Sequence, residues 1–484
     1  MRRYHIVTFG CQMNQHDSDR LRDVLVDAGY TAAEGLETAD LVLLNTCSVR
    51  EKAEQKLRSE VGRIGMLKRA RPGLMIAVAG CVAQQEGERL IKKLPQIDVV
   101  IGPDQARALP RLLEEVEQGG LPQVRTSFDV DEPRFLSGAF GKGPVKVSDF
   151  VTTMKGCDER CTFCVVPTTR GPERYRPSDE ILEEAARLVG RGARELTLLG
   201  QTVDSYIDPL HAIERPVSTR PEPRSARSGR AQRDESEFPG LLRAIAARVP
   251  ELGRLRYTSP HPRHLTGALI DAHRDLEVLA RHVHMPVQSG SDRVLKRMSR
   301  RYDVAEYLER VTALREAVPG LTLSTDIIVG FPGETPEDFE RTLALVRDAG
   351  FIGVYGFKYS QRPFTPALKL DDDVCEEEKS ERLARLFDLS EGMRAAHLRG
   401  LVGSRCRVLI EGKGERGGFT GRSERNEIVH LAAGSDPIGE LLDVEITGAF
   451  KHSLEGAPVD PRWATTSRIE PRRAPGPRAL PMVH

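Results

Sequence analysis

The sequence lacks the marks of a membrane or secreted protein. No apolar run among its 484 residues approaches the roughly 20 that a membrane-spanning helix needs. The first residues, Met-Arg-Arg-Tyr-His-Ile-Val, lead directly into a strand pattern, so we expect no secretory leader. The composition, 39% hydrophobic and 29% charged, is typical of a soluble globular protein. We therefore expect a cytoplasmic chain with no membrane partner and, from its length, about two to four domains.

The sequence also has no excess of charge of either sign. Lys and Arg total 71, Asp and Glu total 71, and the formal net charge is zero. The whole-chain charge therefore predicts no polyanionic partner, and any surface that binds RNA must gather its positive charge locally. The chain contains eight cysteines. Because nothing marks it as secreted, we expect these thiols to be grouped for metal in a reducing compartment rather than paired as disulfides.

Three of the cysteines, Cys157, Cys161 and Cys164, lie in the short run Gly-Cys-Asp-Glu-Arg-Cys-Thr-Phe-Cys. Three thiolates this close can hold three irons of a cubane iron–sulfur cluster and leave the fourth iron open. Electron-carrying clusters normally take four cysteines, so three favour a cluster that does chemistry. The alternative, a zinc knuckle, needs a fourth ligand nearby, and residues 165–184 contain neither Cys nor His. The spacing resembles the signature of radical S-adenosylmethionine (SAM) enzymes, in which SAM caps the open iron.

The first hundred residues alternate short apolar strands with helical stretches. Strands are expected at 4–9, 41–44 and 75–79, and helices at 17–28, 51–68 and 85–93. This order predicts a parallel, doubly wound sheet. Cys11, Cys47 and Cys81 each follow one of the three strands. Loops at the carboxyl ends of such strands converge on one crevice, so these thiols can meet and hold a second cubane cluster. The alternative is three ordinary buried thiols.

The rest of the chain predicts two further folded parts. From about residue 145 to 366, strand–helix units end in glycine or small polar residues, as a partial β/α barrel requires at its mouth. From about residue 401, short strands at 406–411, 419–421, 427–431 and 442–447 predict a small antiparallel barrel. Its basic residues could line a phosphate-binding face or form a solvated surface. These residues are Arg416, Arg422, Arg425, Lys451 and His452.

Two segments interrupt this pattern. Residues 209–237 contain six arginines among Pro, Ser, Ala and Gly, which predicts a disordered basic insert that could touch RNA or have no function. The Pro- and Arg-rich residues 462–484 are expected to form a disordered tail. We predict domains at 1–118 (α/β), 143–375 (barrel) and 380–450 (small β barrel).

Four runs carry a family resemblance: Gly10-Cys-Gln-Met-Asn14, Asn45-Thr-Cys-Ser-Val-Arg-Glu-Lys-Ala53, Gly80-Cys-Val-Ala-Gln-Gln85 and Cys164-Val-Val-Pro-Thr-Thr-Arg-Gly171. With them, residues 3–454 resemble the methylthiotransferases of the radical SAM superfamily. The resemblance implies a cysteine-bearing α/β domain, a radical SAM barrel and a TRAM-type β barrel that binds RNA. Ser48 and the two residues after it favour the branch that modifies isopentenyladenosine in tRNA. The sister branches act on a ribosomal-protein aspartate or on threonylcarbamoyladenosine in tRNA.

The resemblance implies an activity and its cofactors. A methylthio group is installed at C2 of N6-isopentenyladenosine at position 37, in the anticodon loop of tRNA. One SAM is the radical source, which is needed because the C2–H bond offers no acid–base route. A second SAM is the methyl donor. Two 4Fe–4S clusters are implied, one on Cys157, Cys161 and Cys164, the other on Cys11, Cys47 and Cys81 to carry or present sulfur. The electron donor and the sulfur source stay unidentified, and a monomer is the working expectation.

The resemblance also implies a SAM pocket. The backbone of Phe163 meets the adenine of SAM, Gly200 and Gln201 approach its methionine end, and Gln288 and Gly330 line the same pocket. The chain departs from the family at Thr202, Asp204 and Phe364, where the family usually keeps Asn, Asn and Gly. An alternative from another functional class is an iron–sulfur protein that binds RNA or senses redox state without turnover.

Overall fold

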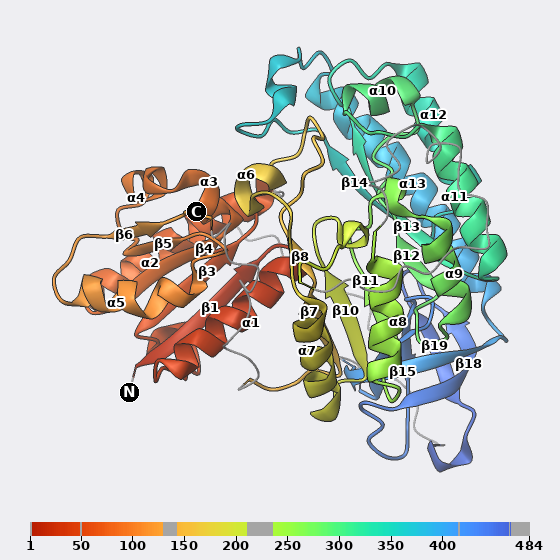
Figure 1. The fold of residues 1–484 in the computed structure, drawn as a ribbon, viewed down its shortest axis with the longest axis horizontal. Coiled ribbons are helices and arrows are strands. Elements are labelled where there is room, and N and C mark those ends of the chain that lie inside the picture. Colours follow the sequence, from red (N-terminus) through yellow and green to blue (C-terminus); the bar gives the residue numbers. More distant parts are fainter. Residues whose placement is uncertain are drawn as a thin grey trace, which may run out of the picture.

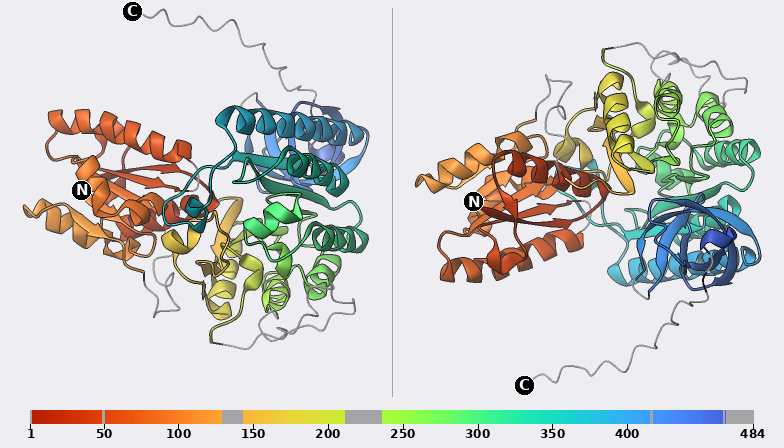
Figure 2. Two further views of the ribbon diagram at one scale, coloured as in Figure 1. Left: turned by 90° about the horizontal axis from the view of Figure 1, so that it is seen from above. Right: turned by 90° about the horizontal axis from the view of Figure 1, so that it is seen from below.

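Three folded bodies make up the part of the chain described by the computed structural model, namely residues 2–48, 51–128, 143–210, 236–414, 417–463 and 465. An N-terminal α/β domain and a small closed barrel each contact a central barrel and lie apart from each other (Figures 1 and 2). Most of the predicted basic insert and of the predicted tail lies outside the described residues. No helix among the described residues is long and apolar enough to cross a membrane.

The N-terminal domain is a parallel six-stranded sheet with strand order β2-β1-β3-β4-β5-β6. Alternate residues of β3 enter two cores: Leu41 and Leu43 pack with α1 and α5, and Val42 and Leu44 pack with α2. Burial on both faces explains the unbroken apolar runs of β3 and β4 and confirms the predicted doubly wound sheet. The strands are β1 (Arg3–Phe9), β2 (Thr31–Ala32), β3 (Leu41–Thr46), β4 (Met75–Gly80), β5 (Val99–Ile101) and β6 (Gln123–Arg125). The helices are α1 (Gln12–Asp27), α2 (Glu51–Ala70), α3 (Cys81–Glu86), α4 (Glu88–Lys93) and α5 (Leu109–Glu117).

The central barrel consists of two three-stranded parallel sheets, β7-β10-β11 and β12-β13-β14. Its helices lie outside the strands (Figure 1), and one continuous hydrophobic core fills the space between the helices and the strands. The predicted partial β/α barrel is therefore confirmed. Its strands are β7 (Ser148–Thr152), β10 (Glu195–Leu199), β11 (Arg254–Tyr257), β12 (His282–His284), β13 (Thr322–Val329) and β14 (Gly353–Lys358). Its helices are α6 (Val166–Arg170), α7 (Ser178–Gly190), α8 (Phe238–Arg248), α9 (Gly267–Asp275), α10 (Asp292–Arg297), α11 (Val304–Ala317), α12 (Pro336–Ala349) and α13 (Glu376–Gly400).

The C-terminal strands close into a barrel in the order β15-β16-β17-β19-β18. All pairs are antiparallel except β17 with β19, so the predicted antiparallel barrel contains one parallel pair. Alternate residues of β18 from Leu442 to Ile446 are buried, which matches the alternation expected of a small barrel. The strands are β15 (Arg405–Lys413), β16 (Phe419–Ser423), β17 (Ile428–Leu431), β18 (Leu441–Ala449) and β19 (Leu454–Pro458).

The closed barrel docks at the end of the central barrel where the strands begin. Arg254 and Arg256, held by Glu195, donate hydrogen bonds to backbone carbonyls of the closed barrel at 3.0–3.4 Å. Arg422 lies 3.6 Å from Glu411, and Arg425 pairs with acidic neighbours, so these two arginines of the predicted phosphate-binding face are engaged internally. Of the others, Arg416 lies outside the described residues, and Lys451 and His452 contact α13.

A buried ion network joins the N-terminal domain to the central barrel. Glu184 of α7 binds Arg20 of α1 through one carboxylate oxygen and Arg176 through the other. Burial alone would raise the pKa of Glu184, but the charges of Arg20 and Arg176 outweigh it and lower that pKa to about 2. The carboxylate therefore stays ionised at the contact and neutralises two guanidinium groups, that of Arg176 fully buried and that of Arg20 largely buried.

We expect Glu184→Gln to destabilise the protein by about 3–5 kcal/mol, because it removes the buried carboxylate that pairs with both Arg20 and Arg176. Urea unfolding of the full chain measures the loss. Glu183→Gln, an exposed position on the same helix, is the matched control and should stay within about 0.5 kcal/mol of wild type. The contribution of Glu184 is complete above its ordinary pKa of 4.5 and disappears as the pH falls toward 2. Equal losses in the two variants would contradict this account.

Candidate functional site

Three adjacent parallel strands bring Cys11, Cys47 and Cys81 together, and we call these residues the N-terminal trio. Cys11 follows β1, Cys47 follows β3, and Cys81 begins α3 directly after β4. Because β1, β3 and β4 are neighbours in the sheet, their carboxyl ends meet at one edge. Gly10 permits the close approach: its φ is +141°, and a Cβ atom there would lie 2.6 Å from Cβ of Cys47.

Neighbouring groups favour a negative charge on Cys11, the first residue of this trio. A hydrogen bond with the thiol of Cys47, assisted by the charge of Arg170, lowers the pKa of Cys11 to about 6, although burial opposes the shift. Burial raises the pKa of Cys81, and Arg170 opposes that rise. Arg170 comes from the central barrel, and its Nε donates to Sγ of Cys81 at 3.2 Å. The site therefore places a fixed positive charge beside sulfur atoms that must be deprotonated to bind metal.

The surroundings of Cys47 contain polar groups that the protein leaves unsatisfied. Thr46 and Ser48 are fully buried, and neither hydroxyl has a hydrogen-bond partner among the described residues. Such orphaned groups are rare in protein interiors and fit a bound group with its own sulfide acceptors. No three Cys, His, Asp or Glu side chains in the described part of the chain are placed to hold one metal ion. A cubane differs in this respect, because each thiolate binds a different iron.

The second group, Cys157, Cys161 and Cys164, lies on the loop between the short strand β8 (Met154–Lys155) and α6, and we call it the central trio. Sγ of Cys157 lies 3.1 Å from Oγ1 of Thr202, and Sγ of Cys161 accepts a hydrogen bond from Arg300 at 3.2 Å. Burial raises the pKa values of Cys157 and Cys164 to about 12. Thr202, where the chain departs from the family, therefore contacts a cysteine of the loop.

The predicted SAM residues Gly200 and Gln201 lie directly beside this loop. Oε1 of Gln201 accepts a hydrogen bond from the backbone N–H of Gly156 at 2.6 Å, and its own N–H points to Sδ of Met154 at 3.2 Å. A Cβ atom on Gly200 would lie 2.7 Å from Cγ of Met154, so only glycine fits there. The end of β10 thus supports the start of the cysteine loop.

Phe163, Gln288 and Gly330 lie further around the mouth. The ring of Phe163 meets that of Phe331 edge to face, with centroids 6.5 Å apart. Gln288 has a φ of +74°, uncommon for a residue other than glycine. A Cβ atom on Gly330 would lie 2.3 Å from the side chain of Lys379, so this turn also requires glycine. Backbone conformation and close packing therefore fix the turns at Gln288 and Gly330.

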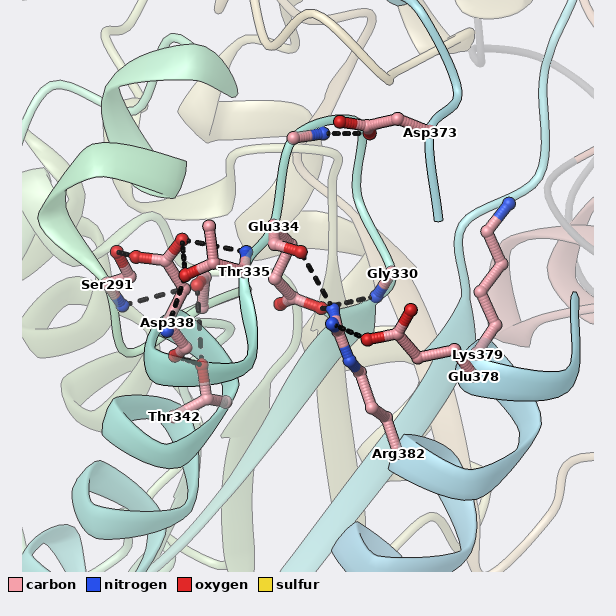
Figure 3. A network of polar contacts seen from close by, with 12 residues as sticks. Ser291, Gly330, Glu334, Thr335, Asp338, Thr342, Asp373, Glu378, Lys379 and Arg382 are labelled. Carbon is pink, nitrogen blue, oxygen red and sulfur yellow. Dashed lines mark hydrogen bonds and ion pairs between the residues drawn. The ribbon is translucent and has the colours of Figure 1, made fainter. Parts of the chain in front are cut away.

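Two buried carboxylates hold these mouth loops in place (Figure 3). Oε2 of Glu334 accepts hydrogen bonds from the N–H of Gly330 and from Arg382 of α13, both at 2.6 Å. Asp338, at the start of α12, accepts a hydrogen bond from Ser291 at 2.6 Å. The loops after β12 and β13 are therefore fixed from two different helices, which pre-organises the mouth for a ligand.

The residue pattern did not reveal several of these supporting side chains. Arg170 and Arg382 are buried and Arg300 is half-buried; these cations contact cysteines or a loop carboxylate, and only Arg170 lies inside a run noted from the sequence. Asp204 is fully buried and accepts a hydrogen bond from the N–H of His261 at 2.8 Å, and burial raises its pKa. Phe364 is 59% exposed with a φ of +66°, so it does not fill the interior of the mouth.

In the protein without metal, we expect iodoacetamide to alkylate Cys11 before Cys157 and Cys164. The rate at Cys11 should reach half its plateau near pH 6, because the pKa of that thiol is lowered and the thiolate is the nucleophile. Peptide mass spectrometry over a pH series measures the three rates, and exposed Cys375 reports access of the reagent. A half-plateau for Cys11 near the ordinary thiol pKa of 9.0 would contradict the assigned electrostatics.

Comparison with known proteins covers all three bodies. Residues 3–102 match the uncharacterized protein family UPF0004, residues 151–346 the radical SAM superfamily and residues 399–459 the TRAM domain. The chain is 59% identical over 505 residues to the tRNA-2-methylthio-N(6)-dimethylallyladenosine synthase of Sorangium cellulosum (strain So ce56), covering 100% of this chain and 99% of that protein. The synthase of the same name from Bordetella petrii is 43% identical over 468 residues, covering 95% and 92%.

Among solved structures, the radical SAM methyltransferase TsrM from Kitasatospora setae, with cobalamin and a 4Fe–4S cluster bound, shares the fold. The TM-score is 0.52 at 15% identity, over 76% of this chain and 77% of that one. At this identity the likeness supports the fold alone.

Proposed function

The chain belongs to the family of the tRNA-2-methylthio-N(6)-dimethylallyladenosine synthases, and from this membership we propose which of its residues hold the cofactors and the substrate. It is a radical SAM enzyme that adds a methylthio group to the isopentenylated adenosine of tRNA, with SAM and two 4Fe–4S clusters as cofactors. The ribosomal-protein substrate, the threonylcarbamoyladenosine substrate and the non-catalytic reading are disfavoured by the same relatives.

We propose that the central trio, Cys157, Cys161 and Cys164, binds three irons of the cluster that holds SAM. The bound cluster and SAM together supply a carbon-centred radical, which this reaction needs because C2 of adenine has neither an acidic proton nor a leaving group. The protein's part is to keep one iron free of side chains. The contacts of Cys157 with Thr202 and of Cys161 with Arg300 hold two thiols in the loop.

Cys11, Cys47 and Cys81 would hold the second cluster in this proposal, and that cluster would carry or present the sulfur. The observation that carries the assignment is that three residues far apart in sequence meet at one sheet edge, beside Arg170 of the segment that also contains Cys164. A radical SAM enzyme that only cleaves SAM needs a single open cluster. A second cysteine trio beside the first fits a reaction that must also install sulfur.

The mouth residues position SAM and the base in this proposal. Phe163 meets the adenine of SAM with its backbone, Gly200 and Gln201 approach the methionine end, and Gln288 and Gly330 line the remaining wall. Support comes from the two turns at Gly200 and Gly330, where a side chain would collide with its neighbours. Without side chains at these two positions the backbone can turn closely against Met154 and Lys379 at the mouth.

We further propose that the substrate enters as the anticodon loop of tRNA. Proteins reach the edges of adenine in splayed, single-stranded loops, so the base must leave its stack to enter the mouth. The closed barrel then contacts the anticodon stem. The proposed domains are 1–118, 143–375 and 380–450, acting as a cytoplasmic monomer.

Nucleoside mass spectrometry of bulk tRNA tests the function directly. In cells that lack the gene, the methylthio nucleoside should disappear and isopentenyladenosine should accumulate. The wild-type gene and Cys375→Ala should restore the methylthio nucleoside, because exposed Cys375 belongs to neither trio. Cys81→Ala should fail to restore it. An unchanged nucleoside profile in the deletion strain would contradict the substrate, and restoration by Cys81→Ala would contradict the second cluster.

Removing the closed barrel tests its role in RNA binding. A chain that ends after Leu401 should bind an anticodon stem-loop about tenfold more weakly, because phosphate contacts dominate such affinities. Arg254 and Arg256, which the barrel covers, become exposed to water in this variant. Fluorescence anisotropy of a labelled stem-loop gives the affinity, and iron content checks that both clusters persist. Wild-type affinity in the truncated chain would refute the role of the barrel.

A further inference from the structure

We propose that Arg170 is a positioning residue for the second cluster, where its fixed charge holds the ligand sulfur of Cys81 and raises the reduction potential of the cluster. This inference rests on the proposed assignment of Cys11, Cys47 and Cys81 to that cluster. It assigns a role to a side chain of the central barrel in a site that the N-terminal domain otherwise builds alone.

The contacts of Arg170 place it inside the N-terminal domain. It is the last residue of α6, and its side chain is 3% exposed. Its Nε donates to Sγ of Cys81 at 3.2 Å, and its Nη2 lies 2.6 Å from Oδ2 of Asp17 on α1. One guanidinium therefore connects a carboxylate on one helix with a cysteine that begins another, across the contact between two domains.

The charges around Arg170 suit an anionic cluster. Burial alone would lower the pKa of Arg170, but Asp17 and then Cys81 raise it well above its ordinary value, so the group stays charged. Its Nη1 is buried and has no hydrogen-bond partner among the described residues. A buried, charged donor left free next to three thiols indicates an acceptor supplied from outside the protein, such as a sulfide of the cluster.

Each trio has a guanidinium of its own, buried at Arg170 and half-buried at Arg300. Arg300 donates to Cys161 of the central trio at the same 3.2 Å that separates Arg170 from Cys81. Hydrogen bonds to ligand sulfurs and nearby positive charge stabilise the reduced, more negative cluster and raise its potential. Arg170 also follows Cys164 on the same short segment. The protein thus uses one segment both to bind the first cluster and to tune the second.

The test uses the full chain with Cys157, Cys161 and Cys164 all changed to alanine, so that only the second cluster forms. After reconstitution with iron and sulfide, the protein should hold about four irons per chain. A redox titration monitored by electron paramagnetic resonance then gives the potential. Arg170→Gln should shift it to more negative values, and Arg170→Lys should shift it less. Asp17→Asn should shift it to more positive values, because that change removes a negative charge.

Opposite shifts for Arg170→Gln and Asp17→Asn separate electrostatic tuning from structural loosening, which would move both potentials in the same direction. Arg300→Gln in the same background is the matched control and should leave the potential unchanged. A wild-type potential in Arg170→Gln overturns the role of Arg170 while the cysteine assignment stands. Absence of a cluster when Arg170 is intact overturns the cysteine assignment itself. If Arg170→Gln binds no iron, the reduction potentials of Arg170→Lys and Asp17→Asn are compared instead. Shifts in opposite directions support the role of Arg170, and shifts in the same direction contradict it.

Discussion

Buried positive charge along the contact between the N-terminal sheet and the central barrel must be neutralised. The ion pairs that neutralise it also position the two cysteine trios relative to each other. Glu184 forms ion pairs with Arg20 and Arg176. Asp104 forms ion pairs with Lys155 and Arg174. Asp17 pairs with Arg170 beside Cys81. A charge without its partner is costly in such an interior, so these groups allow little sliding between the domains. The same ions therefore fix how the edge that bears the N-terminal trio faces the cysteine loop.

Parallel strands explain why all the proposed chemistry lies at one end of each sheet. In the N-terminal domain the cysteines follow β1, β3 and β4, and in the central barrel the mouth residues follow β10, β12 and β13. The strand starts serve a different purpose, because there the arginines of β11 bind the closed barrel. The contact with the closed barrel thus lies at one end of the central barrel, and the proposed radical chemistry at the other.

Much of this arrangement follows from the sequence because it rests on local pattern. Apolar periodicity predicted the doubly wound sheet, cysteine spacing predicted the central trio, and the positions of three cysteines directly after parallel strands predicted the N-terminal trio. Boundaries were less predictable: the expected helix at 85–93 divides at Gly87, whose φ is +52°, into α3 and α4. Contacts between distant segments could not be predicted. Arg300 and Arg382 meet their partners only through tertiary packing, and nothing local to either residue marks it.

The central claim is that the chain carries two clusters, one on each trio. Iron analysis combined with Mössbauer spectroscopy on the reconstituted protein tests it most directly. The wild-type chain should hold about eight irons, and alanine at all three positions of either trio should leave about four, in cubane form. A variant lacking Cys11, Cys47 and Cys81 that keeps the wild-type iron content and spectrum would contradict the account.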